Sequence, residues 1–401
     1  MIKNHSSAPS PQLSSHGAVI CFLVAILMPS VDYYYYYSVI AIMAVGVVVK
    51  RPPLRNELST WFITLSLFFV IATPKLVSYS SLSDVKEFGK VLVFLTTSLI
   101  LNIKFDKKKL TRLFFVVLVV DMVFTLVQWF KFDLAVFNLI DQQIHKQHHI
   151  EGSLSLNSVR ALGVFSDTAE HAAVCLILYL FFLSGLRYSF EPKKSILGLL
   201  FCVIIIVLTQ SKTGVIVLVL SIPILCLNLV RSKADLRSKA IVVTAFFFVM
   251  FYFDNGVNVF EQYQYLLQDG LSISSVGERQ SIWQNVAAVA LNSSPVLLLF
   301  GMGRGALELN NVQASVFDND LIYVLNTFGL FGVLFYIIIV PVSIIYYLRV
   351  NGWSSRWLSY CLIFMTVMGF TTDMISSLKV ITIIGLILAM NLRRESDFAN
   401  R

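Results

Sequence analysis

The sequence predicts an all-α, polytopic integral membrane protein with about 12 transmembrane helices, and two observations support this class. First, 57% of the 401 residues are hydrophobic, 13% are charged and the mean hydropathy is +0.77. Soluble domains carry roughly 25% charged residues. Second, the Lys and Arg residues behind the net charge of +8 lie in short clusters between apolar runs. Cytoplasmic loops of membrane proteins have this pattern, so the charge does not indicate a nucleic-acid partner.

The apolar runs, each a predicted helix, follow one another along the whole chain. A spanning helix needs about 20 residues, so several runs reach that length only with their flanking residues. All the cysteines lie within these runs, which indicates neither a disulfide framework nor a cysteine metal site. We expect residues 1–401 to form a single transmembrane domain. The runs cover about 17–31, 33–49, 58–73, 89–103, 110–130, 161–186, 196–210, 214–230, 240–253, 321–348, 357–376 and 380–392.

Clusters of basic residues orient the predicted helices. If both termini lie in the cytoplasm, every inside loop is basic, as the positive-inside rule expects. The opposite orientation would place each of these basic loops outside, against the rule. This orientation leaves two long outside loops, at 131–160 and, between helices 9 and 10, at 254–320. The second loop contains an amphipathic segment, Ser281–Leu291, which we expect to be helical. Its apolar residues recur at the spacing of one helix face: Ile282, Val286, Val289 and Ala290.

Four cations fall on the outer side of this topology, where loops are usually poor in Lys and Arg. Arg160 opens the sixth helix, Lys212 lies in the short hinge before the eighth, and Arg279 and Arg304 lie in the 254–320 loop. A lone lysine in such a hinge can simply extend to the membrane interface, which is the alternative at Lys212. A group of outer cations instead indicates an anionic ligand, because Arg binds phosphate oxygens bidentately and Lys acts as a point charge.

Further ionisable groups lie at the same predicted end. Glu170 and His171 follow the start of the sixth helix, and Asp318 precedes the tenth. Asp121, midway along the fifth helix, either pairs within the bundle or lines a cavity, and the sequence does not choose between these roles. The stretch HKQHH (145–149) fits no metal-site spacing, and no nucleotide-binding glycine motif is present. We therefore expect neither a metal nor a nucleotide cofactor.

Several stretches resemble motifs of the O-antigen ligase and O-antigen polymerase superfamily. LTQSKTG (208–214) resembles its T-x-S-R turn, and GERQSIWQNVAAVALNSSPVLLLFGMG (277–303) resembles its G-x-R…W…P…G-x-G loop segment. FDNDLIYVLNTFGLFGVLFY (317–336) resembles its (H/D)-N-x-x-L…G-x-x-G start of a helix, and RALGVFSDTAEHAA (160–173) resembles its Arg-led sixth helix. Each motif is degenerate, so the resemblance rests on the order and the spacing of the motifs together. The rest of the chain matches by topology alone.

The resemblance implies a glycosyltransferase of the C-type class that uses a lipid-diphosphate-linked donor. The growing chain would leave its polyprenyl diphosphate and join a sugar hydroxyl of the next oligosaccharide unit, at the periplasmic face of a bacterial inner membrane. Besides that substrate and the lipid bilayer, a chain-length regulator protein is an implied partner. The implied diphosphate-binding residues are Arg160, Lys212, Arg279 and Arg304. The implied catalytic residues are Asp318, Glu170 and His171.

Departures from the family pattern bear on which member the chain resembles. Lys212 stands where the family usually has Arg, which keeps the charge but loses the bidentate fork. Ligases carry His at the position of Asp318, and this chain has no His within 254–320, which favours a Wzy-type polymerase. Arg160 and Arg279 do not fit the spaced Arg…Gly motifs of some polymerases. The alternatives are an O-antigen ligase, a lipid-linked oligosaccharide flippase, which the long outer loop opposes, and a structural membrane subunit.

Overall fold

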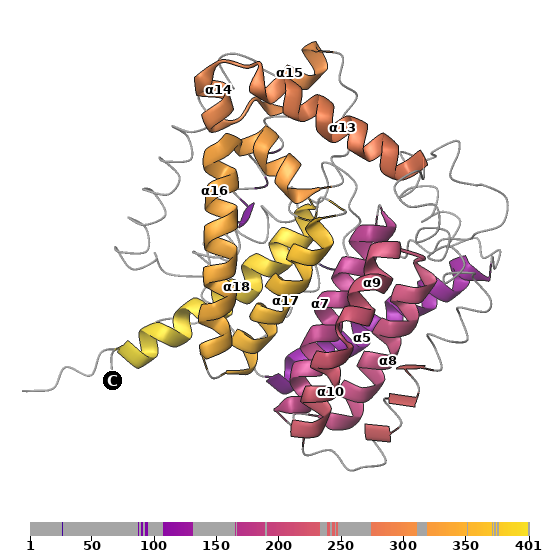
Figure 1. Ribbon diagram of the computed structural model, residues 1–401. Coiled ribbons are helices and arrows are strands. Elements are labelled where there is room, and N and C mark those ends of the chain that lie inside the picture. Colours follow the sequence, from indigo (N-terminus) through magenta and orange to yellow (C-terminus); the bar gives the residue numbers. More distant parts are fainter. Residues whose placement is uncertain are drawn as a thin grey trace, which may run out of the picture.

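The computed structural model describes mainly the central and C-terminal helices of the chain (Figure 1). Within the described residues every regular element is helical and none is a strand, which confirms the all-α prediction. The apolar runs before residue 107 and the run at 240–253 lie almost entirely outside them. The described residues are 26, 87, 90, 93–94, 107–130, 165, 167–188, 191–232, 239–240, 243–244, 246–247, 274–310, 319–350, 352–370, 372, 374 and 377–399.

Segments of membrane-spanning length support a multi-pass membrane protein. Each is at least 18 residues long and strongly apolar. They are α5 (Lys107–Trp129), α7 (Thr168–Arg187), the segment Thr213–Arg231 and α16 (Asp320–Arg349). The segment Thr213–Arg231 comprises α9 (Lys212–Leu220) and α10 (Ile222–Arg231). The other long helices are α8 (Pro192–Leu208), α17 (Trp353–Gly369) and α18 (Leu378–Ala399). The total of about 12 spans stays a prediction.

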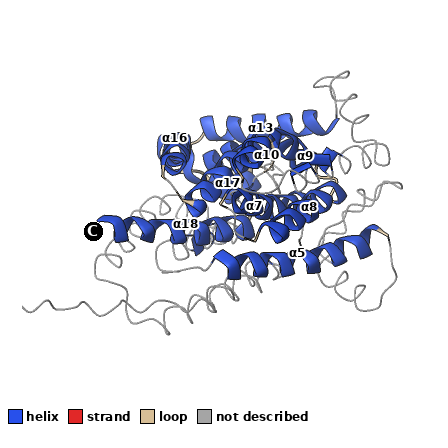
Figure 2. Ribbon diagram, turned by 90° about the horizontal axis from the view of Figure 1, so that it is seen from below, coloured by secondary structure: helices blue, strands red, loops and turns tan. Residues whose placement is uncertain are grey.

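The helix α7 is the centre of the bundle, and α8, α9, α10, α17 and α18 pack against it (Figures 1 and 2). Asp167 begins α7 because its carboxylate accepts hydrogen bonds from the N–H groups of Ala169 and Glu170. Every residue from Glu170 to Leu186 is buried, so the apolar character of α7 reflects contacts with protein on all sides. Trp357 of α17 fixes one of these contacts by donating its indole N–H to the carbonyl oxygen of Ile177, 2.9 Å away.

A tight turn joins α8 to α9 at the end of the bundle where α7 begins. Gln210 adopts a positive φ of 51°, and the Ser211 hydroxyl accepts a hydrogen bond from the Gly214 N–H and caps α9. Lys212 is therefore the first residue of α9, whereas the sequence predicted that it lies in a hinge between helices. A Cβ on Gly214 would lie 2.7 Å from that of Ala172, so the turn packs directly on the second turn of α7.

Three helices of the predicted outer loop form a layer across one end of the molecule: α13 (Ser274–Leu291), α14 (Pro295–Phe300) and α15 (Gly303–Leu309) (Figure 1). Val286 and Ala290 of α13 are buried in the small core of this layer, and Ile282 and Val289 pack against that core. The prediction of an amphipathic helix at Ser281–Leu291 is thus confirmed, with the expected apolar face turned inward.

The helix α16 is broken at Gly329, where φ is 66°. The half before the break starts beside α17, since the Asn319 amide donates a hydrogen bond to the carbonyl oxygen of Phe370 (3.1 Å). The half after the break is a long helix that exposes apolar side chains such as Phe335 and Ile338, as expected for a surface in lipid. The sequence predicted one continuous helix over 321–348, and this prediction is wrong because Gly329 redirects the chain.

The break in α16 lies against the turn between α14 and α15. Gly301 in that turn also has a positive φ, 98°, and the Met302 N–H donates a hydrogen bond to the carbonyl oxygen of Asn326 (2.9 Å). A Cβ on Gly301 would lie 2.5 Å from the Thr327 oxygen, and one on Gly329 would lie 2.5 Å from the Gly301 nitrogen. Two glycines are therefore needed, because the two backbones touch where any side chain would stand.

The basic helix ends gather at the opposite end of the molecule from the outer layer (Figure 1). There α5 and α8 begin, and the exposed Arg112 of α5 pairs with Glu191 at the start of α8, 3.2 Å away. Glu191 also accepts a hydrogen bond from Lys194 (2.7 Å). The basic residues of these ends are Lys107, Lys108, Lys109, Arg187, Lys193, Lys194, Arg231, Arg349 and Arg356. This arrangement is the one that the predicted topology requires of the inside loops.

Candidate functional site

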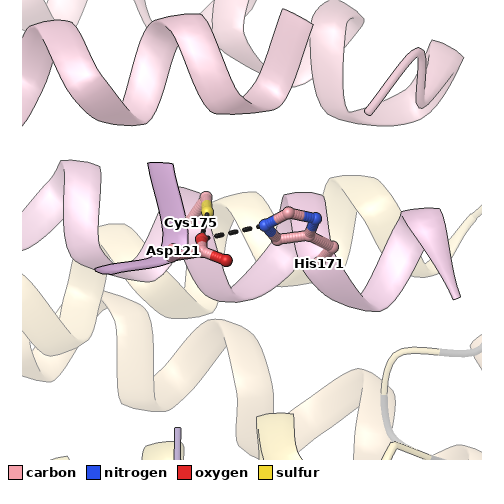
Figure 3. Close-up of side chains that lie close together, drawn as sticks. All are labelled: Asp121, His171 and Cys175. Carbon is pink, nitrogen blue, oxygen red and sulfur yellow. Dashed lines mark hydrogen bonds and ion pairs between the residues drawn. The ribbon is translucent and has the colours of Figure 1, made fainter. Parts of the chain in front are cut away.

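A buried cluster of ionisable side chains lies between the first turns of α7 and the middle of α5, and Asp121 and His171 are its centre (Figure 3). The His171 Nε2 atom is 2.9 Å from an Asp121 carboxylate oxygen, and the Cys175 thiol lies 3.5 Å from the same oxygen. His171 is fully buried and Asp121 is 4% exposed. The phenyl ring of Phe165 stacks on the imidazole with 4.5 Å between the ring centroids. Asp121 thus pairs within the bundle, which resolves the choice that the sequence left open.

A second part of the cluster joins α7 to the start of α18. Glu170, which is 8% exposed, accepts a hydrogen bond from the Ser377 hydroxyl at 2.7 Å. The Lys379 ammonium is fully surrounded by protein, and its Nζ atom lies 4.0 Å from the centroid of the Phe165 ring. The carboxylates of Glu170 and Asp121 are close enough to act electrostatically on this ammonium. The single ammonium therefore balances the charge of one of the two carboxylates inside the bundle.

Compensation matters here because the cluster lies among helices that we assign to the membrane. An ionised side chain in an apolar interior is stable only when it is paired or hydrogen-bonded. Lys379, Cys175 and Ser377 were not singled out by the sequence analysis. The sequence did contain a signal for Lys379, because this ionisable residue directly precedes the apolar run at 380–392. Cys175 gave no signal, since buried cysteines are common in apolar helices.

Another buried polar group connects the broken helix α16 to an earlier segment. The Tyr323 hydroxyl donates a hydrogen bond to the carboxylate of Glu87, and Lys90 pairs with that carboxylate at 2.8 Å. Glu87 is 4% exposed and Tyr323 is 1% exposed. Asp320, at the start of α16, is also buried and interacts with Tyr336 beyond the break. Polar contacts thus hold the first half of α16 on both sides.

The sequence-predicted site residues divide into three groups. Glu170 and His171 are described and buried, and their contacts are with other protein groups. Arg279 is partly exposed on α13, which packs mainly against α14 and α16. Lys212 is the first residue of α9 and Arg304 is the second residue of α15, but their side chains, and all of Arg160 and Asp318, lie outside the described parts. The diphosphate-binding roles and the catalytic roles therefore stay predictions.

Three residues of the cluster have the chemistry of metal ligands. A carboxylate oxygen of Asp121, a ring nitrogen of His171 and the sulfur of Cys175 all lie within 4.8 Å of one another. The sequence gave no hint of this group, because Asp121 lies 50 and 54 residues from the other two. The expectation of no metal rested on the spacing in residues 145–149, which lie outside the described residues, and on the position of all the cysteines within apolar runs.

No protein-family model matches the chain, and no curated protein matches it either. The fold, the buried cluster and the motif resemblance are therefore the grounds for a functional assignment.

Proposed function

We propose that the chain is a membrane glycosyltransferase that polymerises polyprenyl-diphosphate-linked oligosaccharide units into O-antigen or a related surface polysaccharide. The contact between Gly301 and Gly329 carries this proposal. Gly301 belongs to the G-x-G stretch and Gly329 to the G-x-x-G stretch of the motif resemblance, and the two backbones touch. Stretches that resemble family motifs and also pack together support a shared structural unit better than separate matches do.

The outer layer supports the proposed location of the reaction. It covers the end of the molecule opposite the basic helix ends, which is the periplasmic side in the proposed topology (Figure 1). Lys212 begins α9 at that end, beside the first turns of α7, as the contact of Gly214 with Ala172 requires. A helix N-terminus and a lysine together attract phosphate oxygens. This geometry suits a lipid diphosphate held at the membrane boundary.

The reaction that we propose needs charge stabilisation and one proton acceptor. A sugar hydroxyl oxygen of the acceptor unit forms a bond to the anomeric carbon of the growing chain. The bond from that carbon to the diphosphate oxygen breaks, and the polyprenyl diphosphate leaves with the electron pair. Arg160, Lys212, Arg279 and Arg304 would stabilise the negative charge of the leaving group. The hydroxyl proton would pass to Asp318.

Glu170 and His171 suit a positioning role in this reaction better than the role of the base. Glu170 is held by Ser377, and His171 is held by Asp121 and Phe165, all in the protein interior. A buried group does not reach a substrate hydroxyl in this conformation. We therefore assign the base to Asp318 and propose that Glu170 and His171 position the start of α7, where Arg160 precedes them in the chain.

A deletion strain tests the proposal through the banding of its lipopolysaccharide on gels. We expect lipid A-core that carries at most one repeat unit, because ligation continues without the polymerase. Loss of all repeat units would indicate the ligase, or the flippase if lipid-linked units also remain on the cytoplasmic side. Unchanged banding would refute each of these functions.

Complementation of the same strain gives a residue-level test. The Arg279→Ala variant should fail to restore long chains, because a cation for the diphosphate is lost. The Gln280→Ala variant is the matched control, since Gln280 is the exposed neighbour on α13 and carries no charge. Equal chain lengths from the two variants would remove Arg279 from the proposed site.

A further inference from the structure

The ligand geometry of the Asp121 cluster is close to that of a metal site (Figure 3). His171 and Cys175 lie one turn apart on the same face of α7, and Asp121 meets them from α5. The separations from the shared carboxylate oxygen are 2.9 Å to the imidazole nitrogen and 3.5 Å to the sulfur. Around a tetrahedral zinc ion, nitrogen, oxygen and sulfur ligands lie about 3.3–3.7 Å apart. Small side-chain adjustments would therefore admit an ion.

A second observation points independently to a ligand at this place. The other carboxylate oxygen of Asp121, Oδ1, is buried and has no hydrogen-bond partner among the described residues. A carboxylate oxygen left unpaired in an apolar interior is costly, by about 1–3 kcal/mol or more for a charged group. A hydrogen-bonded triad of Asp121, His171 and Cys175 explains the contacts of Oδ2 but leaves Oδ1 without a partner. A bound cation would satisfy the carboxylate.

We propose that Asp121, His171 and Cys175 bind one divalent transition-metal ion of the zinc class, which links α5 to α7 inside the bundle. A thiolate, an imidazole and a carboxylate suit zinc and its neighbours, whereas magnesium and calcium prefer oxygen ligands alone. The charges also agree. The charges of the ion, the Asp121 carboxylate and the Cys175 thiolate sum to zero, and those of Lys379 and Glu170 also sum to zero, so the whole cluster is neutral, as an apolar interior favours.

One aromatic neighbour restricts the orientation of a proposed ligand. Phe165 packs on the His171 ring and limits its rotation. A further buried thiol, that of Cys202 on α8, is not in the group whose ligand atoms lie within 4.8 Å of one another, so the proposed site has three protein ligands. The proposed ion is structural and takes no part in the glycosyl transfer. Its binding is therefore independent of the proposed function.

Metal binding can be measured on the intact protein in detergent, after removal of any histidine tag. We expect about one equivalent of zinc per chain by elemental analysis. Titration with Co²⁺ should give the near-ultraviolet absorption of a thiolate-bound cobalt ion. Loss of a ligand should weaken binding by more than the about 10–100-fold that losing an outer-shell partner costs. The Cys175→Ser and Asp121→Asn variants should thus lose the absorption.

The matched control is Cys361→Ser, which removes a buried cysteine from α17 that is not one of the proposed ligands. This variant should keep the cobalt absorption. Metal-free wild-type protein, or a Cys175→Ser variant that keeps the absorption, would overturn the proposal. If Cys175→Ser does not fold, X-ray absorption of the zinc-loaded wild type decides instead. Sulfur, nitrogen and oxygen in its coordination shell support the site, and a shell without sulfur overturns it.

Discussion

Replacing Gly329 by alanine tests the backbone contact that joins the outer layer to α16. The substitution adds one methyl group at a residue with a φ of 66° and a ψ of −162°, a region that only glycine occupies readily. The new Cβ would meet the Leu299 carbonyl oxygen and would lie 2.5 Å from the Gly301 nitrogen. Both neighbours are backbone atoms, so no side chain can rotate to make room.

The expected loss of stability follows from two terms. Holding alanine in this backbone region costs about 1–3 kcal/mol. Moving the backbone of the α14–α15 turn away from the methyl group is a form of overpacking, which costs typically about 1–3 kcal/mol more. With an unfolding entropy of about 2.1 cal/mol/K per residue, a chain of 401 residues loses roughly 1.2 °C per kcal/mol. We therefore expect the apparent melting temperature to fall by about 2–7 °C.

The assay is thermal unfolding of the purified variant in detergent, followed by tryptophan fluorescence. Leu330→Ala is the control, because Leu330 is the next residue and its side chain is 39% exposed. Truncating such a surface residue should change the stability by less than about 0.5 kcal/mol. If Gly329→Ala has the same melting temperature as Leu330→Ala, the two backbones do not touch as described.

Three further predictions concern the proposed site, the topology and one surface ion pair. Lys212→Ala should abolish long chains on polysaccharide gels, because losing one partner of a desolvated pair costs about 2–5 kcal/mol, roughly 30-fold or more. Lys212→Arg should keep much of the function, and full-length polymer from Lys212→Ala would make the lysine an interface anchor only. Alkaline phosphatase fused after Gly270 should be active and fused after Lys233 inactive, and the reverse result would contradict the orientation. The hydrogen bond from Lys194 holds the pKa of Glu191 below its ordinary value of 4.5, so this stabilisation is present at neutral pH and is lost as the pH falls through the lowered pKa. Glu191→Gln should therefore lower the melting temperature at neutral pH but not in acid, and equal effects at both would disprove the linkage.

The sequence was most informative where the spacing of apolar residues shows which face of a helix is buried. The spacing of Ile282, Val286, Val289 and Ala290 predicted α13 and its buried face, because an amphipathic helix packs along one side. The break at Gly329 was not predictable in this way. Apolar residues continue on both sides of it, and hydropathy does not distinguish a glycine within a helix from one with a positive φ.

The buried cluster shows a different limit of sequence reasoning. Asp121 was recognised as unusual because ionisable residues are rare inside membrane helices. Its partners could not be assigned, since His171 and Cys175 lie on another helix and hydropathy does not encode which helices pack together. Lys212 was placed in a hinge for a related reason. The predicted run begins at 214, whereas α9 begins at Lys212 after the Ser211 cap, which depends on backbone dihedral angles as well as on the residue type.

The gathering of basic helix ends on one side has a consequence for the surrounding lipids. In the predicted topology, residues such as Lys108, Lys193 and Arg349 lie at the level of the phospholipid headgroups on the cytoplasmic side. Each Lys or Arg near an anionic leaflet contributes about 1 kcal/mol of attraction. Because this attraction decays over about 10 Å at moderate salt, it acts on the first shell of headgroups alone. Anionic phospholipids should therefore be enriched around this side and be retained when the protein is extracted with mild detergent.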